Sequence, residues 1–463
     1  MLEQKSFSAR FKIASARVLK SDGRFHDSEL VPRQMDEAIR RLHDEFGCKV
    51  INISLSDPAR PASTKPSAWA AVLDDLAREL DLIIVVAAGN RNDLASSFGA
   101  AREEVVNRYP QYLFDPGNRL LEPGTAANVI TVGSISVGNG LRADDDVAVR
   151  AITGSDQPSP FSRIGPGVSE IVKPDFVDYG GTCLFDGAAQ QLLKGDSRSE
   201  AGIICPNSNY LAGLLGSKCG TSLAAPLLAH KAAILREAFP QASANLIRTL
   251  LALSSEVPAM AKTLLSGFDH DDIVRIVGNG VSQLDRALYS NDNRVILYDE
   301  AVIHSDHFLV YELPIPEDFQ STKGSKRIDV ALAFDPPTRR TREDYLGHTM
   351  SFDLFRGRTL ADVFDACRKW LASEQGEPLK IDGKYRCKLE PSITRRGAST
   401  LQRATYLASK DISHYGDTWH LVVRCESGWS PVSDQRFAIA VEMSHEADIQ
   451  LHSRLQERLR VRV

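Results

Sequence analysis

Apolar residues in the first 290 residues follow two patterns: a helical spacing of three and four, and short continuous runs that are typical of buried strands. Between Val31 and Phe46 they recur at spacings of three and four, which predicts a helix with one face against a core. Gly47 can cap its end. Further predicted elements are strands at Lys12 to Val18, Val50 to Ser54, Leu82 to Val86 and Val129 to Val132, and helices at Trp69 to Leu80 and Ser222 to Phe239. Strands that alternate with helices predict an α/β fold with a doubly wound, mostly parallel sheet.

After about residue 295 the pattern changes to short runs in which apolar and polar residues alternate between turn signals. Such runs predict strands, interrupted by one helical stretch at Leu360 to Leu371. The runs are Phe308 to Tyr311, Arg327 to Leu332, Trp419 to Val423, Phe437 to Val441 and Leu459 to Val463. We therefore expect two domains: one over residues 1–295, and a β-rich, sandwich-like C-terminal domain over residues 296–463.

Composition and charge indicate a folded globular protein and argue against nucleic-acid and membrane partners. A hydrophobic content of 43% and a charged content of 25% in 463 residues predict a folded globular chain. The net charge of -5 predicts no nucleic-acid partner. The N-terminal residues lack the apolar run of a secretory signal, and no apolar stretch is long enough to span a bilayer. The seven cysteines are scattered without metal-binding spacing, so we expect reduced thiols, a cytoplasmic location and no membrane partner.

The residues from Gly220 to Pro226, GTSLAAP, carry the most specific chemical signal in the chain. Ser222 lies at the predicted start of a helix, where unpaired backbone N–H groups and the positive end of the helix dipole suit a nearby oxyanion. The small Gly220 lets a substrate backbone approach closely. A serine in this position is more often a simple helix cap, but the seven-residue context favours a nucleophile.

These seven residues resemble the serine motif of the subtilases, the subtilisin-like serine peptidases of family S8. Upstream, the strand ending in Ala87-Ala88-Gly89-Asn90 resembles the subtilase strand whose asparagine completes the oxyanion hole. The resemblance covers roughly residues 10 to 290. It implies peptide-bond hydrolysis through an acyl-enzyme, with Ser222 and Asn90 as catalytic residues. It also implies that Ser54, Leu55 and Ser56, together with Gly220, bind the polypeptide substrate as an added strand.

The sequence departs from the family in one respect. Subtilases carry Asp first, His second and Ser last, and both earlier residues should precede Arg17, where no Asp or His occurs. His26 and His230 resemble surface or packing residues rather than a general base. We expect an N-terminally truncated domain, with little activity as an isolated chain. Three explanations follow, in order of preference: a lost or misassigned N-terminal segment, a complementing second chain, or a non-catalytic relative that acts as a binding or regulatory protein.

No cofactor is expected. The acidic stretches Asp144 to Asp146 and Asp269 to Asp272 offer oxygen ligands that could hold Ca2+, as some subtilases do. Neither stretch has an EF-hand pattern, and solvated acidic loops are the favoured interpretation.

Overall fold

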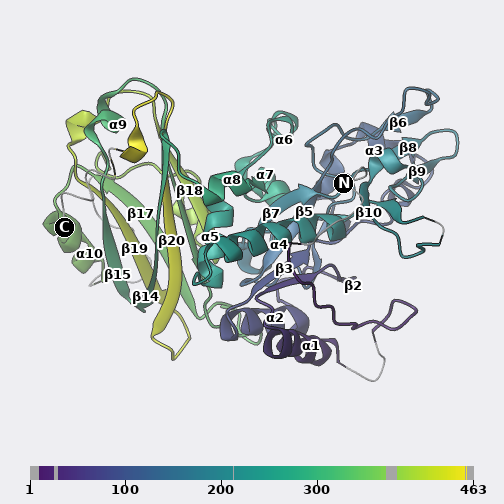
Figure 1. Ribbon diagram of the computed structural model, residues 1–463, viewed down its shortest axis with the longest axis horizontal. Helices are drawn as coiled ribbons and strands as arrows, with labels where there is room; N and C mark the ends of the chain where they lie inside the picture. The colour runs from purple at the N-terminus through teal and green to yellow at the C-terminus, as the bar shows by residue number, and fades with distance from the viewer. Residues whose placement is uncertain (1–9, 26–29, 212, 372–382, 454, 456–463) are drawn as a thin grey trace.

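A computed structural model describes residues 10–25, 30–211, 213–371, 383–453 and 455. The chain forms two blocks, a mixed helical and parallel-sheet block and an antiparallel block, with α5 (Ala244–Leu253) between them (Figure 1). The expected α/β fold with a parallel sheet and a β-rich region after it is confirmed. In the described residues, no helix is long and apolar enough to cross a bilayer.

The first block is built on a four-stranded parallel sheet. Its strand order is β1 (Val50–Ile53), β3 (Ile83–Ala87), β5 (Ile130–Ile135) and β7 (Phe176–Tyr179). Side chains of a strand point alternately to the two faces, so each face is covered separately. Val85 packs with α4 (Thr221–Ala238) and α5, whereas Ile84 and Val86 pack with α1 (Val31–Phe46) and α2 (Ala68–Glu79). Helices on both faces explain why these strands are almost continuously apolar.

Local signals set the helix boundaries near the predicted positions. Gly47 ends α1 with a φ of 65°, and its N–H donates to the carbonyl of His43, as expected for a C-terminal cap. α2 begins after Ser67, whose Oγ accepts a hydrogen bond from the N–H of Ala70 at 3.0 Å. These caps determine where α1 ends and where α2 begins. The two helices cover the face of the sheet that carries Ile84 and Val86.

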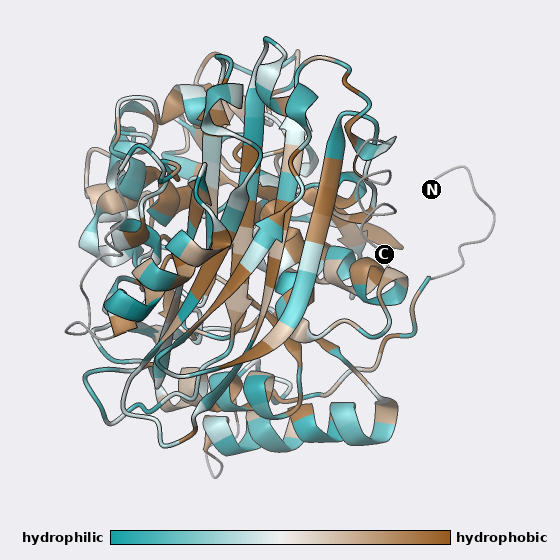
Figure 2. Cartoon of the chain, turned by 90° about the vertical axis from the view of Figure 1, so that its left-hand side faces the viewer, coloured by the Kyte–Doolittle hydropathy of each residue, from teal (hydrophilic) through white to brown (hydrophobic). Residues whose placement is uncertain are grey.

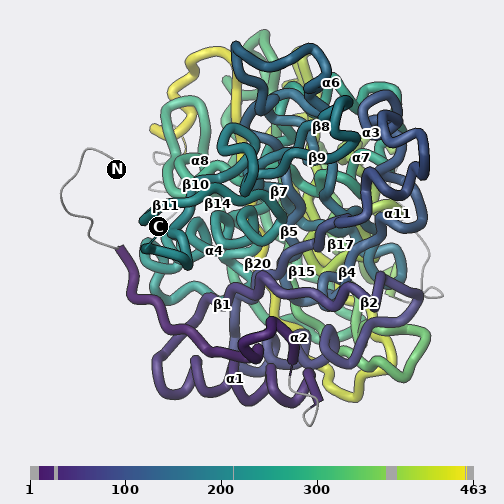
Figure 3. Tube along the Cα trace, turned by 90° about the vertical axis from the view of Figure 1, so that its right-hand side faces the viewer, coloured from purple at the N-terminus to yellow at the C-terminus, as the bar shows by residue number. Residues whose placement is uncertain are grey.

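The predicted strand at Lys12 to Val18 is wrong: these residues are irregular. The carbonyl of Val18 accepts from Gln34 Nε2 at 2.9 Å, and the ring of Phe11 makes an edge contact with His230. The segment therefore runs down the flank of the block toward α1 without joining the sheet (Figure 3). A strand needs a hydrogen-bonded neighbour, and within the described ranges β1 is paired with β3 and with no strand on its other edge.

Shorter elements complete the first block. They are β2 (Asp57–Pro61), α3 (Glu104–Asn107), β4 (Leu121–Glu122), β6 (Val149–Ala151), β8 (Leu184–Asp186), β9 (Gln191–Leu193), β10 (Ile203–Pro206), β11 (Leu215–Lys218), β12 (Ser255–Glu256), α6 (Ala259–Leu264), α7 (His270–Val277), β13 (Val281–Ser282) and α8 (Leu284–Leu288). Short 3-10 helices lie at Ser96–Phe98, Gln111–Phe114, Pro116–Asn118, Val168–Glu170 and Ser199–Ala201, and one at Ser413–Tyr415 in the second block.

The second block contains two antiparallel sheets with a common core. One has the order β14 (Arg294–His304), β20 (Asp434–His445), β16 (Lys326–Phe334), β18 (Leu401–Ala408); the other has the order β15 (His307–Leu313), β19 (Trp419–Ser427), β17 (His348–Arg356). Hydrophilic and hydrophobic segments alternate along the long strands (Figure 2). Inward side chains of both sheets, such as Val330 and Phe352, form one cluster. The helices are α9 (Glu317–Ser321), α10 (Leu360–Leu371), as predicted, and α11 (Ile393–Arg396). The predicted strand at Leu459 to Val463 lies outside the described residues.

All ten residues of α5 are buried. One side packs against α4 and the parallel sheet, and the other packs against β16, β18 and β20, so that Ala331 and Ala440 belong to the same hydrophobic cluster as Val85. The two blocks therefore share one core. The division into domains at residues 295 and 296 stays a prediction, and β14 begins beside it at Arg294.

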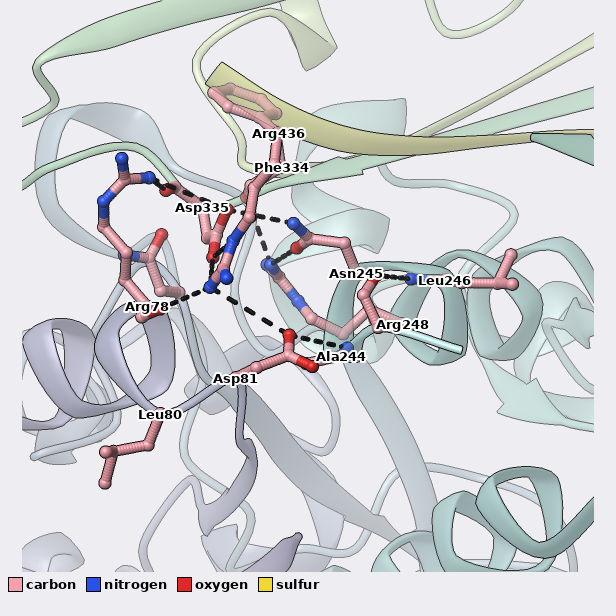
Figure 4. Close-up of polar contacts among 12 residues, drawn as sticks. Arg78, Leu80, Asp81, Ala244, Asn245, Leu246, Arg248, Phe334, Asp335 and Arg436 are labelled. Atoms are coloured by element: carbon pink, nitrogen blue, oxygen red, sulfur yellow. Dashed lines mark hydrogen bonds and ion pairs between the residues drawn. The ribbon is translucent and has the colours of Figure 1, made fainter. Parts of the chain in front are cut away.

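Asp335, directly after β16, connects the two blocks through ion pairs and a hydrogen bond (Figure 4). Its carboxylate is 6% exposed and accepts from Arg436 of β20 and, at 3.0 Å, from Asn245 Nδ2 of α5. Arg78 at the end of α2 lies within 3.8 Å. Arg248 of α5 donates to the carbonyl of Phe334 at 3.1 Å. One carboxylate thus gathers cationic and amide groups from three elements.

Asp74 of α2 forms a second connection. Its fully buried carboxylate accepts from the backbone N–H groups of Ala127 and Asn128 at 2.9 and 2.6 Å, and from the hydroxyl of Tyr345 at 2.6 Å. Burial raises the pKa of Asp74 to about 6, and the hydrogen bond from Tyr345 is the largest opposing effect. Tyr345 belongs to the second block, so this carboxyl also joins the blocks.

The change Asp335→Asn should lower the free energy of unfolding by about 2–4 kcal/mol, because it removes the charged partner of Arg78 and leaves Arg436 with the more distant Asp81, at 4.0 Å. Arg436 is 35% exposed, which keeps the cost below that of a fully buried pair. Urea denaturation measures the change. The control Glu45→Gln removes an exposed partner of Arg41 and should change stability by less than about 1 kcal/mol. Equal effects of the two variants would contradict the role of Asp335.

The native pKa of Asp74 lies above the value of 3.8 for a free carboxyl. Between pH about 4 and 6 the native state therefore holds a proton on Asp74 that the unfolded state releases. For this reason Asp74 makes the free energy of unfolding fall as the pH rises through this range, by about 3 kcal/mol in total. Denaturation across this range should show that Asp74→Asn loses this contribution. Tyr345→Phe should extend the loss of stability to higher pH, because it removes a hydrogen bond that favours the carboxylate. An unchanged profile in Asp74→Asn would show that another group is responsible.

Candidate active site

Ser222 lies in the first turn of α4, next to the carboxyl end of β1. Its Oγ donates a hydrogen bond to the carbonyl of Ser54 at 3.3 Å, and Ser54 Oγ donates to the carbonyl of Ser222 at 3.0 Å. The side chain is partly exposed, so a substrate can reach the hydroxyl. The reciprocal bonds hold the start of the helix against the end of the strand.

Asn90 directly follows Gly89 beyond the end of β3, as the sequence predicts, and its amide is held by Thr221. Asn90 Oδ1 accepts from the N–H of Thr221 at 2.9 Å and from its hydroxyl at 3.2 Å. The hydroxyl oxygen of Thr221 in turn accepts from the N–H of Gly89 at 3.2 Å. Because Oδ1 is occupied, Nδ2 is the atom free to donate, and it lies 3.2 Å from the position that a Cβ on Gly220 would take.

Gly220 lies next to the amide of Asn90 and two residues before Ser222, the candidate nucleophile. Its φ of 150° is unfavourable for residues with a side chain, and its N–H donates to the carbonyl of Gly180 at 2.8 Å. The structure therefore brings together Ser222, Asn90, Gly220 and Ser54, residues that lie far apart in the sequence. Thr221, which orients Asn90, was missed by sequence reasoning although it lies inside the motif; a hydroxyl beside the nucleophile was the available signal.

In the described part of the chain, no His, Asp or Glu side chain is hydrogen-bonded to Ser222; its recorded bonds are those with Ser54. His230 is exposed and contacts Phe11, as expected for a surface residue. His26 lies outside the described residues. A backbone carbonyl such as that of Ser54 cannot accept the proton that an attacking serine must lose. The described residues thus bring together Ser222, the candidate nucleophile, and Asn90, the candidate oxyanion donor, without a base hydrogen-bonded to the serine.

Leu55 and Ser56 continue from Ser54 and line a cavity of about 740 Å³. Phe25 and Trp69 also line it, which gives it a partly aromatic wall. Glu122 lies in the same lining. Burial raises the pKa of Glu122, although Thr125 and Ser67 donate hydrogen bonds to it. The predicted substrate-binding edge therefore borders a space that can receive a side chain.

Carboxylates of both acidic stretches that could hold Ca2+ have partners within the protein; in the second stretch, Asp271 pairs with Arg395 at 3.4 Å. Asp145 pairs with Arg198, and Asp146 accepts from the N–H of Ala148 at 2.8 Å. Over the described ranges, no group of three or more His, Cys, Asp or Glu side chains is placed to hold a metal ion.

Comparison with known proteins locates the chain among its relatives. A sequence model of the subtilase family, Peptidase_S8, matches residues 7–280. An uncharacterized protein of Sinorhizobium fredii is 46% identical over 434 residues, which are 93% of this chain and 100% of that protein.

Solved structures are more distant. A protease from Pseudoalteromonas arctica is 19% identical with a TM-score of 0.34, and the match covers 56% of this chain and 58% of that one. The prenylagaramide maturation protease PagA is 18% identical with a TM-score of 0.34, and the match covers 57% and 70%. The chain thus spans less than two thirds of the Pseudoalteromonas protease that it matches.

The change Gly220→Ala should lower the free energy of unfolding by about 1–2 kcal/mol, because alanine resists the positive φ and its Cβ would press on the amide of Asn90. Thermal or urea denaturation measures this. Gly216→Ala is the matched control in the preceding strand, where a Cβ meets its nearest neighbour at 3.7 Å and φ is not positive. A loss of stability no larger than in this control would show that the backbone at Gly220 is not constrained.

Proposed function

Because this chain belongs to the subtilase family, we propose that it hydrolyses peptide bonds by acyl transfer, with Ser222 as nucleophile and Asn90 as oxyanion donor. The observation that carries the proposal is the orientation of Asn90. Thr221 occupies its Oδ1, which leaves Nδ2 beside Gly220 and the first turn of α4. A tetrahedral oxyanion formed at Ser222 would receive this donor together with backbone N–H groups of the helix start.

The substrate is a polypeptide. We propose that it lies along Ser54, Leu55 and Ser56 as an added strand and passes Gly220, where no side chain obstructs it. One of its side chains would enter the cavity beside Leu55 and Trp69. The apolar wall of this cavity favours a large apolar side chain at that position.

The general base must come from residues other than those that contact Ser222 in the described structure. β1 is the end strand of a parallel sheet, and its outer edge has no strand beside it in the described residues. The carboxyl end of β1 leads to Ser54, which touches Ser222. A segment that pairs in parallel with this edge would therefore end next to Ser222 and could place a base there. We propose that such a segment, from this gene product or from a complementing chain, completes the site.

A binding or regulatory function is the second candidate, favoured by the absence of a base next to Ser222 in the described part. In that case the edge from Ser54 to Ser56 would hold a polypeptide without cleaving it. The two C-terminal sheets would then act as a sandwich-like accessory domain of a binding protein.

A fluorophosphonate probe, which modifies activated serines, tests the proposal with imidazole added as an external base. The chain alone should react slowly, because loss of the activating histidine costs about a millionfold in kcat in subtilisin itself, a value that we borrow. Imidazole should accelerate labelling of residue 222. Asn90→Ala should reduce the imidazole-dependent rate by roughly a hundred- to thousandfold, the effect known for this donor in subtilisin. Mass spectrometry of the labelled peptide gives the rate.

Two controls make the result specific. Ser222→Ala should abolish labelling of that peptide, and Asn139→Ala, which changes an exposed asparagine elsewhere, should leave the rate unchanged. If imidazole does not accelerate labelling, or Asn90→Ala reacts like wild type, peptide hydrolysis is excluded in favour of the binding function. Rapid labelling without imidazole that is lost in His26→Ala would overturn the external origin of the base.

A further inference from the structure

A second cavity lies in the C-terminal block, beside β17 and β19 of the three-stranded sheet. Its volume is about 900 Å³, and Ser351, Asp353 and Arg424 contribute to its lining. Side chains alternate along β17 and β19, so these residues share the face on which Phe355 and Val422 pack with α10. Ser351 lies directly opposite Arg424 in the register. On this face of the sheet, the polar residues Ser351, Asp353 and Arg424 thus follow directly after the apolar residues that contact α10.

Three arginines surround a single carboxylate in this cavity, which we call the arginine pocket. Asp353 Oδ1 accepts from Arg386 Nε and Nη2 at 3.0 and 2.5 Å, and Oδ2 accepts from Arg424 Nη2 at 2.6 Å. Arg396 donates instead to the carbonyl oxygens of Phe352 and Pro391, at 2.5 and 3.3 Å. One negative charge therefore balances two guanidinium groups, and the third meets only neutral acceptors.

The remaining charged residues of the lining do not cancel this excess. Lys388, which pairs with Glu390 outside the lining at 3.0 Å, adds a positive charge and Glu426 a negative one, so the lining itself carries four basic and two acidic side chains. The whole chain has a net charge of -5, which makes the pocket a local positive site on an acidic protein. Such a site attracts anions over a distance of about one Debye length.

Several buried polar groups in the pocket have no hydrogen-bond partner among the described residues. Arg396 and Arg424 are each 3% exposed, and their Nε atoms are bonded to no residue in the described ranges; the same holds for Ser351 Oγ. Burial lowers the pKa of Arg396 to about 10, and the neighbouring arginines act in the same direction against Asp353. Buried donors without partners are unfavourable, and an anionic group would supply both the acceptor atoms and the opposite charge.

We propose that the arginine pocket binds an acidic polypeptide segment through its carboxylate side chains. Arginine forks match carboxylate geometry, and the volume exceeds what a lone ion needs. Met350, Leu389 and Ile393 also line the pocket, so the ligand must carry apolar as well as anionic groups, as a polypeptide does. Strand addition does not explain the site, because the carbonyl of Met350 on the β17 edge is already bonded to Gln402. The proposal does not depend on catalysis by Ser222.

Fluorescence anisotropy of a fluorescein-labelled polyglutamate peptide with the full chain tests the proposal. Wild type should bind it saturably, more weakly at higher salt, and should not bind a polyglutamine peptide of the same length. Arg386→Gln should weaken binding about tenfold or more, since it removes a charged donor at the mouth of the pocket. Lys388 is 87% exposed, so Lys388→Gln cannot disturb the fold, and it should weaken binding about two- to threefold.

Arg142→Gln is the matched control, because Arg142 also pairs with a carboxylate, that of Glu200, and is 43% exposed. It should bind the peptide like wild type. Equal affinity of wild type, Arg386→Gln and Lys388→Gln would overturn the proposal, as would binding of polyglutamine. If inorganic phosphate displaces the peptide more effectively than free glutamate does at equal ionic strength, the pocket is a phosphate site and the assignment to acidic polypeptides is wrong.

Discussion

The burial of α5 on both sides is the constraint on which the rest of the structure depends. A helix whose residues are all buried must be covered all round, and the first block alone covers only the side of α5 that faces α4 and the parallel sheet. Strands β16, β18 and β20 cover the other side. The small residues Ala331 and Ala440 at this contact let the sheet approach the helix closely. The polar groups of α5 are satisfied across the same contact, since Asn245 donates to Asp335 and Arg248 to Phe334.

The same constraint supports the candidate active site. α4 packs against the parallel sheet and against α5, so these contacts determine the position of its first turn. The carboxyl ends of β1 and β3 then meet that turn through Ser54 and Asn90. Asn90, the proposed oxyanion donor, is held by Thr221, which donates two hydrogen bonds to its Oδ1. This part of the site is therefore arranged in advance, which is what electrostatic stabilisation of a transition state requires.

Much of this organisation could be predicted from the sequence, because it depends on local pattern. The helix from 31 to 46, the helix from 360 to 371 and the strand before Asn90 follow directly from apolar spacing and caps. The meeting of Ser222 and Asn90 could be predicted only through a family resemblance. The segment from Lys12 to Val18 was predicted wrongly because its composition suits a strand, while strand formation also requires a neighbour, which no local pattern reveals.

Other features could not be predicted, because they rest on contacts between distant residues. Nothing in the sequence near Asp335 indicates that it will meet Arg436, about a hundred positions later, or Arg78 in the first block. The arginine pocket likewise combines β17, β19 and the loop around Arg386. Charged residues of this kind are usually solvated, and only the three-dimensional pairing of strands shows which of them are buried.

The shared core also affects the order of events during synthesis. α5 ends at Leu253, whereas its second cover is complete only with β20, which ends at His445. At translation rates of about 5–20 residues per second, the intervening chain of about 190 residues takes about 10–40 s to emerge. During this time the side of α5 that β20 covers lacks part of its final cover. A nascent chain in this state is a natural client for chaperones that bind exposed apolar segments, and the final packing of the first block has to follow translation of the second.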